Sequence, residues 1–78
     1  MTNEKGKNIY RKLLYFFENK IKVHFKDLDE IFYNGLIIDL NETKQTLVLQ
    51  ERVRGIMPIL LEFIKEDSIV EFKERDTW

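Results

Sequence analysis

The fold is decided by the stretch Ile31-Phe32-Tyr33-Asn34-Gly35-Leu36-Ile37-Ile38-Asp39-Leu40. It is almost wholly apolar around Asn34 and Gly35, and its aromatic and β-branched side chains predict a strand rather than a helix. Glycine inside a strand often marks a sharp bend or a close backbone approach. We therefore expect one long strand that is bent at Gly35. A small barrel needs such a bend where a single strand takes part in both halves of its curved sheet.

Upstream of this stretch the sequence predicts a helix over residues 7–19. Its apolar side chains recur at the i, i+3, i+4 spacing of an amphipathic helix. They are Ile9, Tyr10, Leu13, Leu14, Phe16, Phe17 and Ile21. Glycine costs about 1 kcal/mol inside a helix, so we expect the first regular turn to begin after Gly6.

From Lys20 onward the hydrophobic period is two, which predicts strands. Residues 21–25 alternate between apolar and polar side chains, and a polar turn over residues 27–30 separates them from the long strand. Further strands are expected at residues 46–49, 57–61 and 68–72, separated by a polar turn at 41–45, a loop around Arg54 and Gly55, and a short connection at 62–67. Five short strands favour an antiparallel barrel, with the helix covering one open end.

The chain is therefore predicted to be one mainly β domain, residues 1–78, with an N-terminal helix at 7–19, a barrel at 20–72 and a charged tail at 73–78. It contains no cysteine and one histidine, which excludes a zinc site because zinc requires four ligands drawn mainly from these residues. No apolar run reaches the roughly 20 residues that a membrane span needs, and no signal peptide is visible, so we expect a cytoplasmic protein.

The long strand also carries a family resemblance. Residues 33–40, followed by the strand at 46–49, resemble the first motif of the Sm-like (LSm) proteins of archaeal type, and the pattern extends over residues 7–72. The resemblance implies a five-stranded Sm-like small barrel with an RNA-associated role. In this family the loop after the second strand binds uridine; here that loop is residues 41–45 and has no aromatic side chain or histidine. Tudor-like and chromatin-binding barrels share the strand order without sharing the function.

A candidate RNA-binding set combines basic and polar side chains. The lysines at positions 20, 22 and 26 are spaced by even numbers and so share one strand face, where phosphate contact is expected. The full set is Lys20, Lys22, His24, Lys26, Asn41, Lys44, Gln45 and Arg54. Alternate lysines also occur as a solvated strand face that blocks unwanted pairing, and a strand histidine is often only solvent-facing. Single-stranded RNA is the partner that this set would take.

The alternative function is a protein-interaction module acting as an accessory subunit of a larger complex. A net charge of −1 gives no global attraction for phosphates and favours this alternative. Neither hypothesis involves catalysis, because the acidic residues at positions 62, 66, 67 and 71 accompany no nucleophile–base pair, phosphate loop or metal-ligand spacing. We expect no catalytic residues, no metal and no cofactor.

A homo-oligomer, either a dimer or a ring, is the expected assembly, because a chain this small buries too little surface to be very stable alone. The Sm resemblance implies that the fourth strand of one subunit pairs with the fifth strand of the next. The predicted contact residues are Met57, Leu60, Ile69, Val70 and Phe72. Pro58 has no N–H, so the fourth strand is expected to lose one ladder bond and the ring to be irregular.

Overall fold

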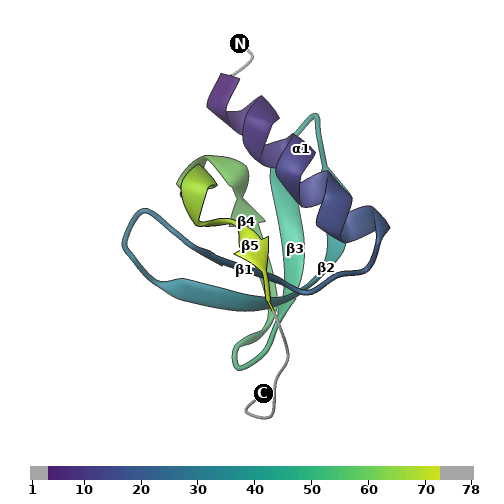
Figure 1. The fold of residues 1–78 in the computed structure, drawn as a ribbon, viewed down its shortest axis with the longest axis vertical. Coiled ribbons are helices and arrows are strands. Elements are labelled where there is room, and N and C mark those ends of the chain that lie inside the picture. The colour runs from purple at the N-terminus through teal and green to yellow at the C-terminus, as the bar shows by residue number, and fades with distance from the viewer. Residues whose placement is uncertain (1–3, 73–78) are drawn as a thin grey trace.

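The computed structural model describes residues 4–72 and shows one N-terminal helix followed by five strands (Figure 1). The elements in chain order are α1 (Glu4–Glu18), β1 (Val23–Lys26), β2 (Phe32–Asn41), β3 (Thr46–Glu51), β4 (Gly55–Leu60), the 3-10 turns η1 (Leu61–Phe63) and η2 (Glu66–Ser68), and β5 (Val70–Glu71). The expected mainly β class with one helix is confirmed. The predicted charged tail at 73–78 lies outside the described residues.

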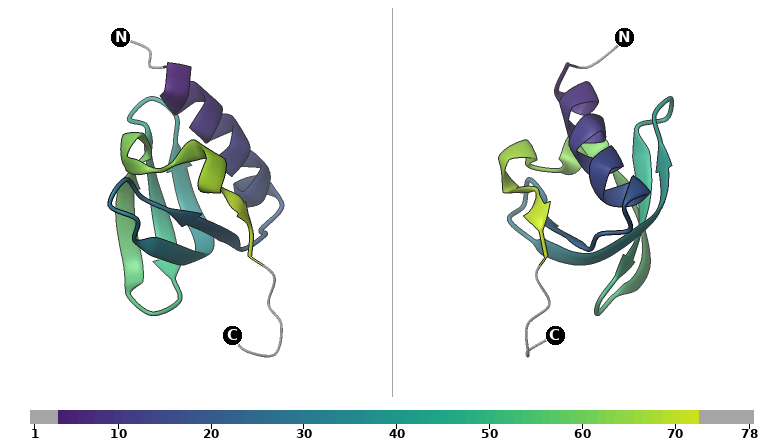
Figure 2. Two further views of the ribbon diagram at one scale, coloured as in Figure 1. Left: turned by 60° about the vertical axis from the view of Figure 1, so that its left-hand side comes forward. Right: turned by 45° about the vertical axis from the view of Figure 1, so that its right-hand side comes forward.

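All five strands belong to one antiparallel sheet in the order β4-β3-β2-β1-β5. The sheet is strongly curved, and α1 lies over the mouth of the curve (Figure 2). β4 and β5 form the two edges and do not pair with each other, so the sheet is open. The predicted barrel is therefore confirmed only as a curved, five-stranded antiparallel sheet.

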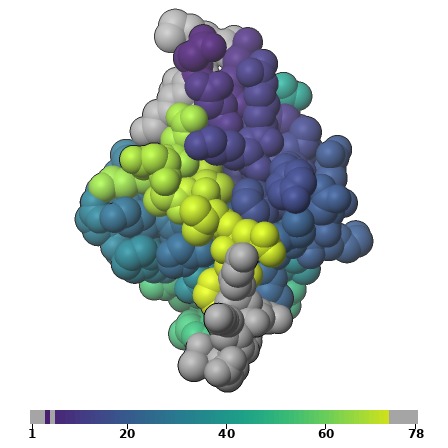
Figure 3. All heavy atoms as spheres, viewed as in Figure 1, coloured from purple at the N-terminus to yellow at the C-terminus, as the bar shows by residue number. Residues whose placement is uncertain are grey.

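The core lies between α1 and the inner face of the sheet. Every second residue of β1 and β3 is buried, as the alternation of apolar side chains predicts. The core side chains are Ile9, Leu13, Phe16, Val23, Phe25, Ile37, Leu47, Leu49, Leu61, Ile64 and Ile69. The segment from η1 to β5 packs between the helix and the β1–β2 hairpin, as the space-filling view shows (Figure 3). This segment supplies three of the core residues, and an antiparallel bridge between Asp27 and Ile64 joins it to the end of β1.

β2 and β3 approach each other closely at Gly35. A Cβ atom at this position would lie 2.2 Å from the carbonyl oxygen of Gln50 and 2.9 Å from the Cα atom of Glu51. No side chain fits there, which explains the glycine that the sequence pattern singles out. Further along β2 the register shifts between Ile37 and Asp39, which adds a bulge and more curvature.

Several predicted boundaries are wrong: β4 begins at Gly55 rather than at residue 57, and β5 spans only Val70–Glu71 rather than residues 68–72. The helix begins at Glu4 rather than at residue 7, and it contains Gly6, where an added Cβ atom would lie 2.0 Å from Oε1 of Gln45. The close approach of the β2–β3 turn gives this glycine a packing role that helix propensity does not include. Lys20 does not begin a strand: it lies in the turn after α1 with a φ of 54°.

Pro58 costs the sheet no hydrogen bond, contrary to the expected loss of a ladder bond. The Leu61 N–H donates to the carbonyl oxygen of Gln45 directly opposite it, which makes this a hydrogen-bonded pair. Such pairs alternate with non-bonded ones along an antiparallel ladder, so Pro58 and its partner Val48 form a non-bonded pair. The missing N–H therefore falls on the free edge of β4, where proline is tolerated.

Candidate nucleic-acid interface

The outer face of β1 combines basic and aromatic side chains. Because Val23 and Phe25 point into the core, the residues between and beside them point away from α1. His24 lies opposite Asn34 of β2 and Val70 of β5, and Lys26 lies opposite Phe32. The Phe72 N–H donates to the carbonyl oxygen of Lys22. We call this surface the outer β1 patch; it consists of Lys22, His24, Lys26, Phe32, Asn34, Val70 and Phe72.

Three rings form the centre of the patch. The His24 and Phe32 rings are stacked, with centroids 5.1 Å apart and planes inclined by 15°. Phe72 lies on the other side of His24 at 6.4 Å. His24 Nδ1 hydrogen-bonds to the side-chain amide of Asn34 on the neighbouring strand. Phe32 nevertheless keeps 54% of its surface exposed, so a flat ring is presented to the outside.

Basic side chains flank these rings. Lys26 Nζ lies 5.7 Å from the centroid of the Phe32 ring and 2.8 Å from Oε1 of Glu30. Glu30 also binds Lys65, so one carboxylate is shared by two ammonium groups. The hydrogen bonds from Lys26 and then Lys65 lower the pKa of Glu30 to about 2. Lys26 and Lys65 therefore share the Glu30 carboxylate beside the patch, and Asp67 adds a further negative charge near Lys65.

A shallow hollow of about 290 Å³ adjoins the patch between Lys22 and Arg52. Gly35 and Leu36 of β2 line it together with Gln50 and Glu51 of β3. The Arg52 N–H donates to the carbonyl oxygen of Asn34 at 2.8 Å, which ties the β3–β4 turn to β2. The hollow is thus bordered by a cation on each side.

Glu51 fixes this turn from inside the protein. Its buried carboxylate accepts hydrogen bonds from the backbone N–H groups of Asn34 at 3.1 Å, Val53 at 2.9 Å and Arg54 at 2.7 Å. Burial alone would raise the pKa of Glu51, but these three N–H groups, together with the nearby Arg54 guanidinium, hold it below its ordinary value. The carboxylate therefore stays charged and keeps Arg52 beside the outer β1 patch.

The structure brings together only part of the predicted RNA-binding set. Lys22, His24 and Lys26 share the outer face, as their spacing predicts. Asn41, Lys44 and Gln45 lie instead at the β2–β3 turn near the N-terminal part of α1, far along the hairpin from Phe32 (Figure 1). There the Lys44 N–H donates to Oδ1 of Asn41.

Arg54 and Lys20 also fall outside the patch. Arg54 Nη1 donates to the carbonyl oxygen of Phe32, lies 3.3 Å from Oε2 of Glu51, and its guanidinium covers the Tyr33 ring at 4.9 Å. This arginine is engaged in holding the end of the sheet together. Lys20 precedes β1 in a turn.

Four of the five predicted oligomer contacts lie on the two edge strands or directly beside them, where pairing of β4 with β5 of a neighbouring subunit would place them. Met57 and Leu60 lie on or beside β4, whereas Val70 and Phe72 belong to the outer β1 patch on the opposite edge. Ile69 packs in the core of its own chain and offers little surface to a second copy.

Sequence reasoning missed the aromatic half of the patch. The predicted RNA-binding set does not contain Phe32, and Phe72 belongs only to the predicted oligomer contacts. The signal that identifies them is cross-strand register, because Phe32 lies opposite Lys26 and Val70 lies opposite His24. Arg52 and Glu51 were also missed, since their roles depend on a turn that bends back onto β2.

Within residues 4–72 no group of three or more His, Cys, Asp or Glu side chains is arranged to hold a metal ion. In the same part of the chain, no helix combines the length and apolar character that a membrane span requires. No protein-family model matches the sequence, and neither a curated protein nor a solved structure shows significant similarity to it.

Proposed function

We propose that this chain is a non-catalytic, Sm-like binding protein whose outer β1 patch holds single-stranded RNA. The observation that carries the proposal is the stacked His24–Phe32 pair, flanked by Lys22 and Lys26 on one sheet face. Single-stranded nucleic acids are bound by such combinations, because bases stack on exposed rings while ammonium groups contact the phosphates.

The local charge matters here because the whole chain carries a net charge of only −1. Attraction of a polyanion must come from the cations around the patch and the hollow, namely Lys22, Lys26 and Arg52. No acidic side chain occupies the outer-face positions paired across β5, β1 and β2 in this region, which are Val70, His24, Asn34, Lys26 and Phe32. Binding is therefore expected at low salt and is expected to weaken as salt rises.

The arrangement of the strands supports the Sm-like part of the proposal. β4 and β5 are both free edges, which pairing of these strands between neighbouring subunits requires. Self-association through these edges, with Leu60 and Val70 at the contact, is the alternative to the binding of other chains there. Light scattering at micromolar concentration tests it, because a mass near the 9.5 kDa of one chain contradicts self-association.

The RNA proposal is tested by fluorescence anisotropy with a fluorescein-labelled decauridine at low salt. Phe32→Ala removes the exposed ring, and a stacked base contributes about 1 to 3 kcal/mol, so affinity should fall about 5- to 150-fold. Tyr15→Ala is the matched control, because Tyr15 is an aromatic residue of α1 with a similar exposed fraction, 57%. It should bind like the wild type.

Two results would contradict the proposal. One is the absence of decauridine binding by the wild-type protein at low salt. The other is an equal loss of affinity in Phe32→Ala and Tyr15→Ala, which would show that no particular face is used.

A further inference from the structure

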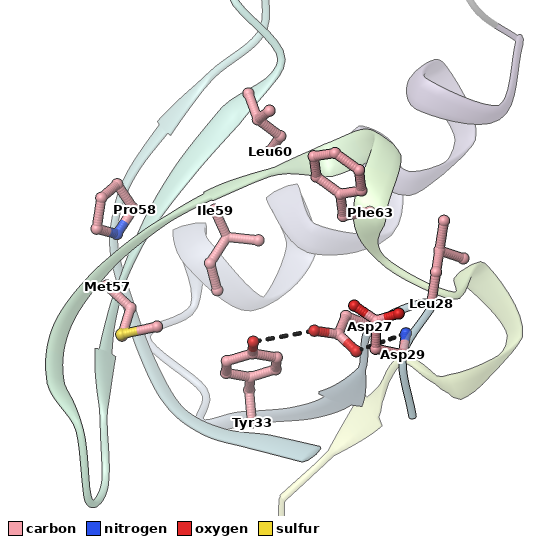
Figure 4. A pocket seen from close by; sticks show the side chains of 9 residues that line it. All are labelled: Asp27, Leu28, Asp29, Tyr33, Met57, Pro58, Ile59, Leu60 and Phe63. Atoms are coloured by element: carbon pink, nitrogen blue, oxygen red, sulfur yellow. Dashed lines mark hydrogen bonds between the residues drawn. The ribbon is translucent and has the colours of Figure 1, made fainter. Parts of the chain in front are cut away.

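A second surface of different chemistry lies along the inner side of β4. Here a groove of about 390 Å³ separates β4 from the turn that follows β1 (Figure 4). We call it the β4 groove; its walls include Leu28, Tyr33, Met57, Ile59 and Phe63. The Leu28 N–H donates to the carbonyl oxygen of Phe63, which closes the groove at the η1 end.

The walls of the β4 groove are apolar and only partly covered. Leu28 and Phe63 keep 47% and 48% of their surfaces exposed, and both lie at the end of the groove away from Met57 (Figure 4). Tyr33 is held rigidly at the base, because Phe25 stacks on it at 5.5 Å and the Arg54 guanidinium lies over it at 4.9 Å. The groove is thus a preformed apolar site. The Tyr33 ring contributes its edge to this site, because Phe25 and Arg54 lie against its faces.

Among residues 4–72, the only charged side chains that line the groove are those of Asp27 and Asp29. The Asp27 carboxylate is fully used: it accepts the Tyr33 hydroxyl at 3.0 Å and the N–H groups of Asp29 and Ile31. The Asp29 carboxylate has no hydrogen bond or ion pair with any residue in the described part of the chain. Two carboxylates disfavour a nucleic acid and favour a cationic group at this end.

The free edge of β4 adjoins the groove. Since Pro58 occupies a non-bonded pair with β3, the same alternation turns the backbone groups of Ile56 and Leu60 outward, away from β3. An extended chain can pair with such an edge while its alternate side chains enter a neighbouring pocket. At Pro58 itself the edge offers a carbonyl oxygen and no N–H.

We propose that the β4 groove binds an extended peptide segment of another protein, with one large apolar side chain in the groove and a Lys or Arg beside it at Asp29. The apolar walls match the large apolar side chain, and the Asp29 carboxylate matches the Lys or Arg. The free edge of β4 matches the extended backbone of the segment. The site is independent of the outer β1 patch, since the two share no residue.

The probe is a displayed library of random dodecapeptides, selected on the wild-type protein and depleted on the Leu28→Glu variant. Leu28→Glu puts a charge on the wall, and Val53→Glu is the matched control, because Val53 is 79% exposed and lies outside the groove. Enriched sequences should contain a large apolar residue next to Lys or Arg.

A synthetic peptide from the selection should bind at least tenfold more weakly to Leu28→Glu, and equally to the wild type, Val53→Glu and Phe32→Ala. Asp29→Asn should remove the preference for Lys or Arg over Gln in that peptide, which keeps the test valid if Leu28→Glu does not fold. The proposal is overturned if no sequence is enriched or if Asp29→Asn leaves the preference unchanged. It is also overturned if light scattering shows a dimer that Leu28→Glu converts to a monomer, because a second copy then occupies the groove.

Discussion

The outer β1 patch and the β4 groove are built from neighbouring residues but have opposite chemistry. Phe32 and Tyr33 are adjacent in the sequence, yet Phe32 points outward beside Lys26, whereas Tyr33 points inward beside Asp27. Strand alternation alone separates them, because successive side chains of a strand lie on opposite faces. One hairpin therefore presents a basic aromatic surface on one side and an acidic apolar groove on the other.

This comparison explains why the net charge of −1 is a poor guide to the partners of the chain. The net charge is a sum over the whole chain, so it hides two local differences. Lys22, Lys26 and Arg52 border one face, whereas Asp27 and Asp29 line the groove. The two surfaces are thus expected to differ in partner class.

The largest expected effect comes from Phe25→Ala, which acts on both surfaces at once. Phe25 is fully buried, supports Tyr33 of the β4 groove by stacking, and sits between His24 and Lys26 of the outer β1 patch. Truncation should lower the free energy of unfolding by about 3 to 5 kcal/mol. Urea denaturation measures the change, and a loss below about 1 kcal/mol would show that β1 is not anchored in the core.

A smaller effect is expected from Glu51→Gln, at the turn that serves both surfaces. Because hydrogen bonds hold the folded-state pKa of Glu51 below its ordinary value, the charged carboxylate stabilises the fold above that value. This contribution is lost as the pH falls through the folded-state pKa. At neutral pH, Glu51→Gln should cost about 1 to 3 kcal/mol, since hydrogen bonds to a charged group are replaced by weaker ones.

The pH dependence sharpens this test. Below pH 4.5 the wild type should lose stability more steeply than Glu51→Gln, whose side chain does not titrate. Glu42→Gln, in the exposed β2–β3 turn, serves as the control and should follow the wild type. Identical acid denaturation of the wild type and Glu51→Gln would show that this carboxylate does not stabilise the turn.

The smallest effect separates the two surfaces by charge. The double variant Lys22→Gln, Lys26→Gln should weaken decauridine binding about tenfold at low salt and reduce the log–log salt slope by about 1 to 1.5. Asp29→Asn, in the β4 groove, should leave the affinity within about twofold of the wild type, because it removes an exposed charge on another face. If the double lysine variant and Asp29→Asn changed the affinity for decauridine equally, the charges of the two surfaces would not act separately on RNA binding.

The sequence alone predicts much of the fold because hydrophobic period is local. The period-two alternation of Val23 and Phe25 identifies β1, and the apolar stretch around Gly35 identifies β2. The start of the helix was misplaced because Gly6 packs against Gln45, about 40 positions away in the chain. The openness of the sheet likewise depends on whether β4 and β5 meet, which no local pattern encodes.

The candidate site was only half predictable for the same reason. The even spacing of Lys22, His24 and Lys26 places them on one face without reference to any other strand. The position of Phe32 on that face depends on the register of β1 with β2, and Phe72 depends on the pairing with β5. Asn41 and Lys44 were included because of the Sm resemblance, and they lie at the other end of the hairpin.

The central claim, that single-stranded RNA binds on the outer β1 patch, is tested most directly by titrating the ¹⁵N-labelled protein with decauridine and following the backbone amide signals. The account predicts the largest shifts at His24, Phe32, Asn34 and Val70, with little change at Leu28, Met57 and Phe63 of the β4 groove. Shifts concentrated at the β4 groove, or no shifts at low salt, would contradict it.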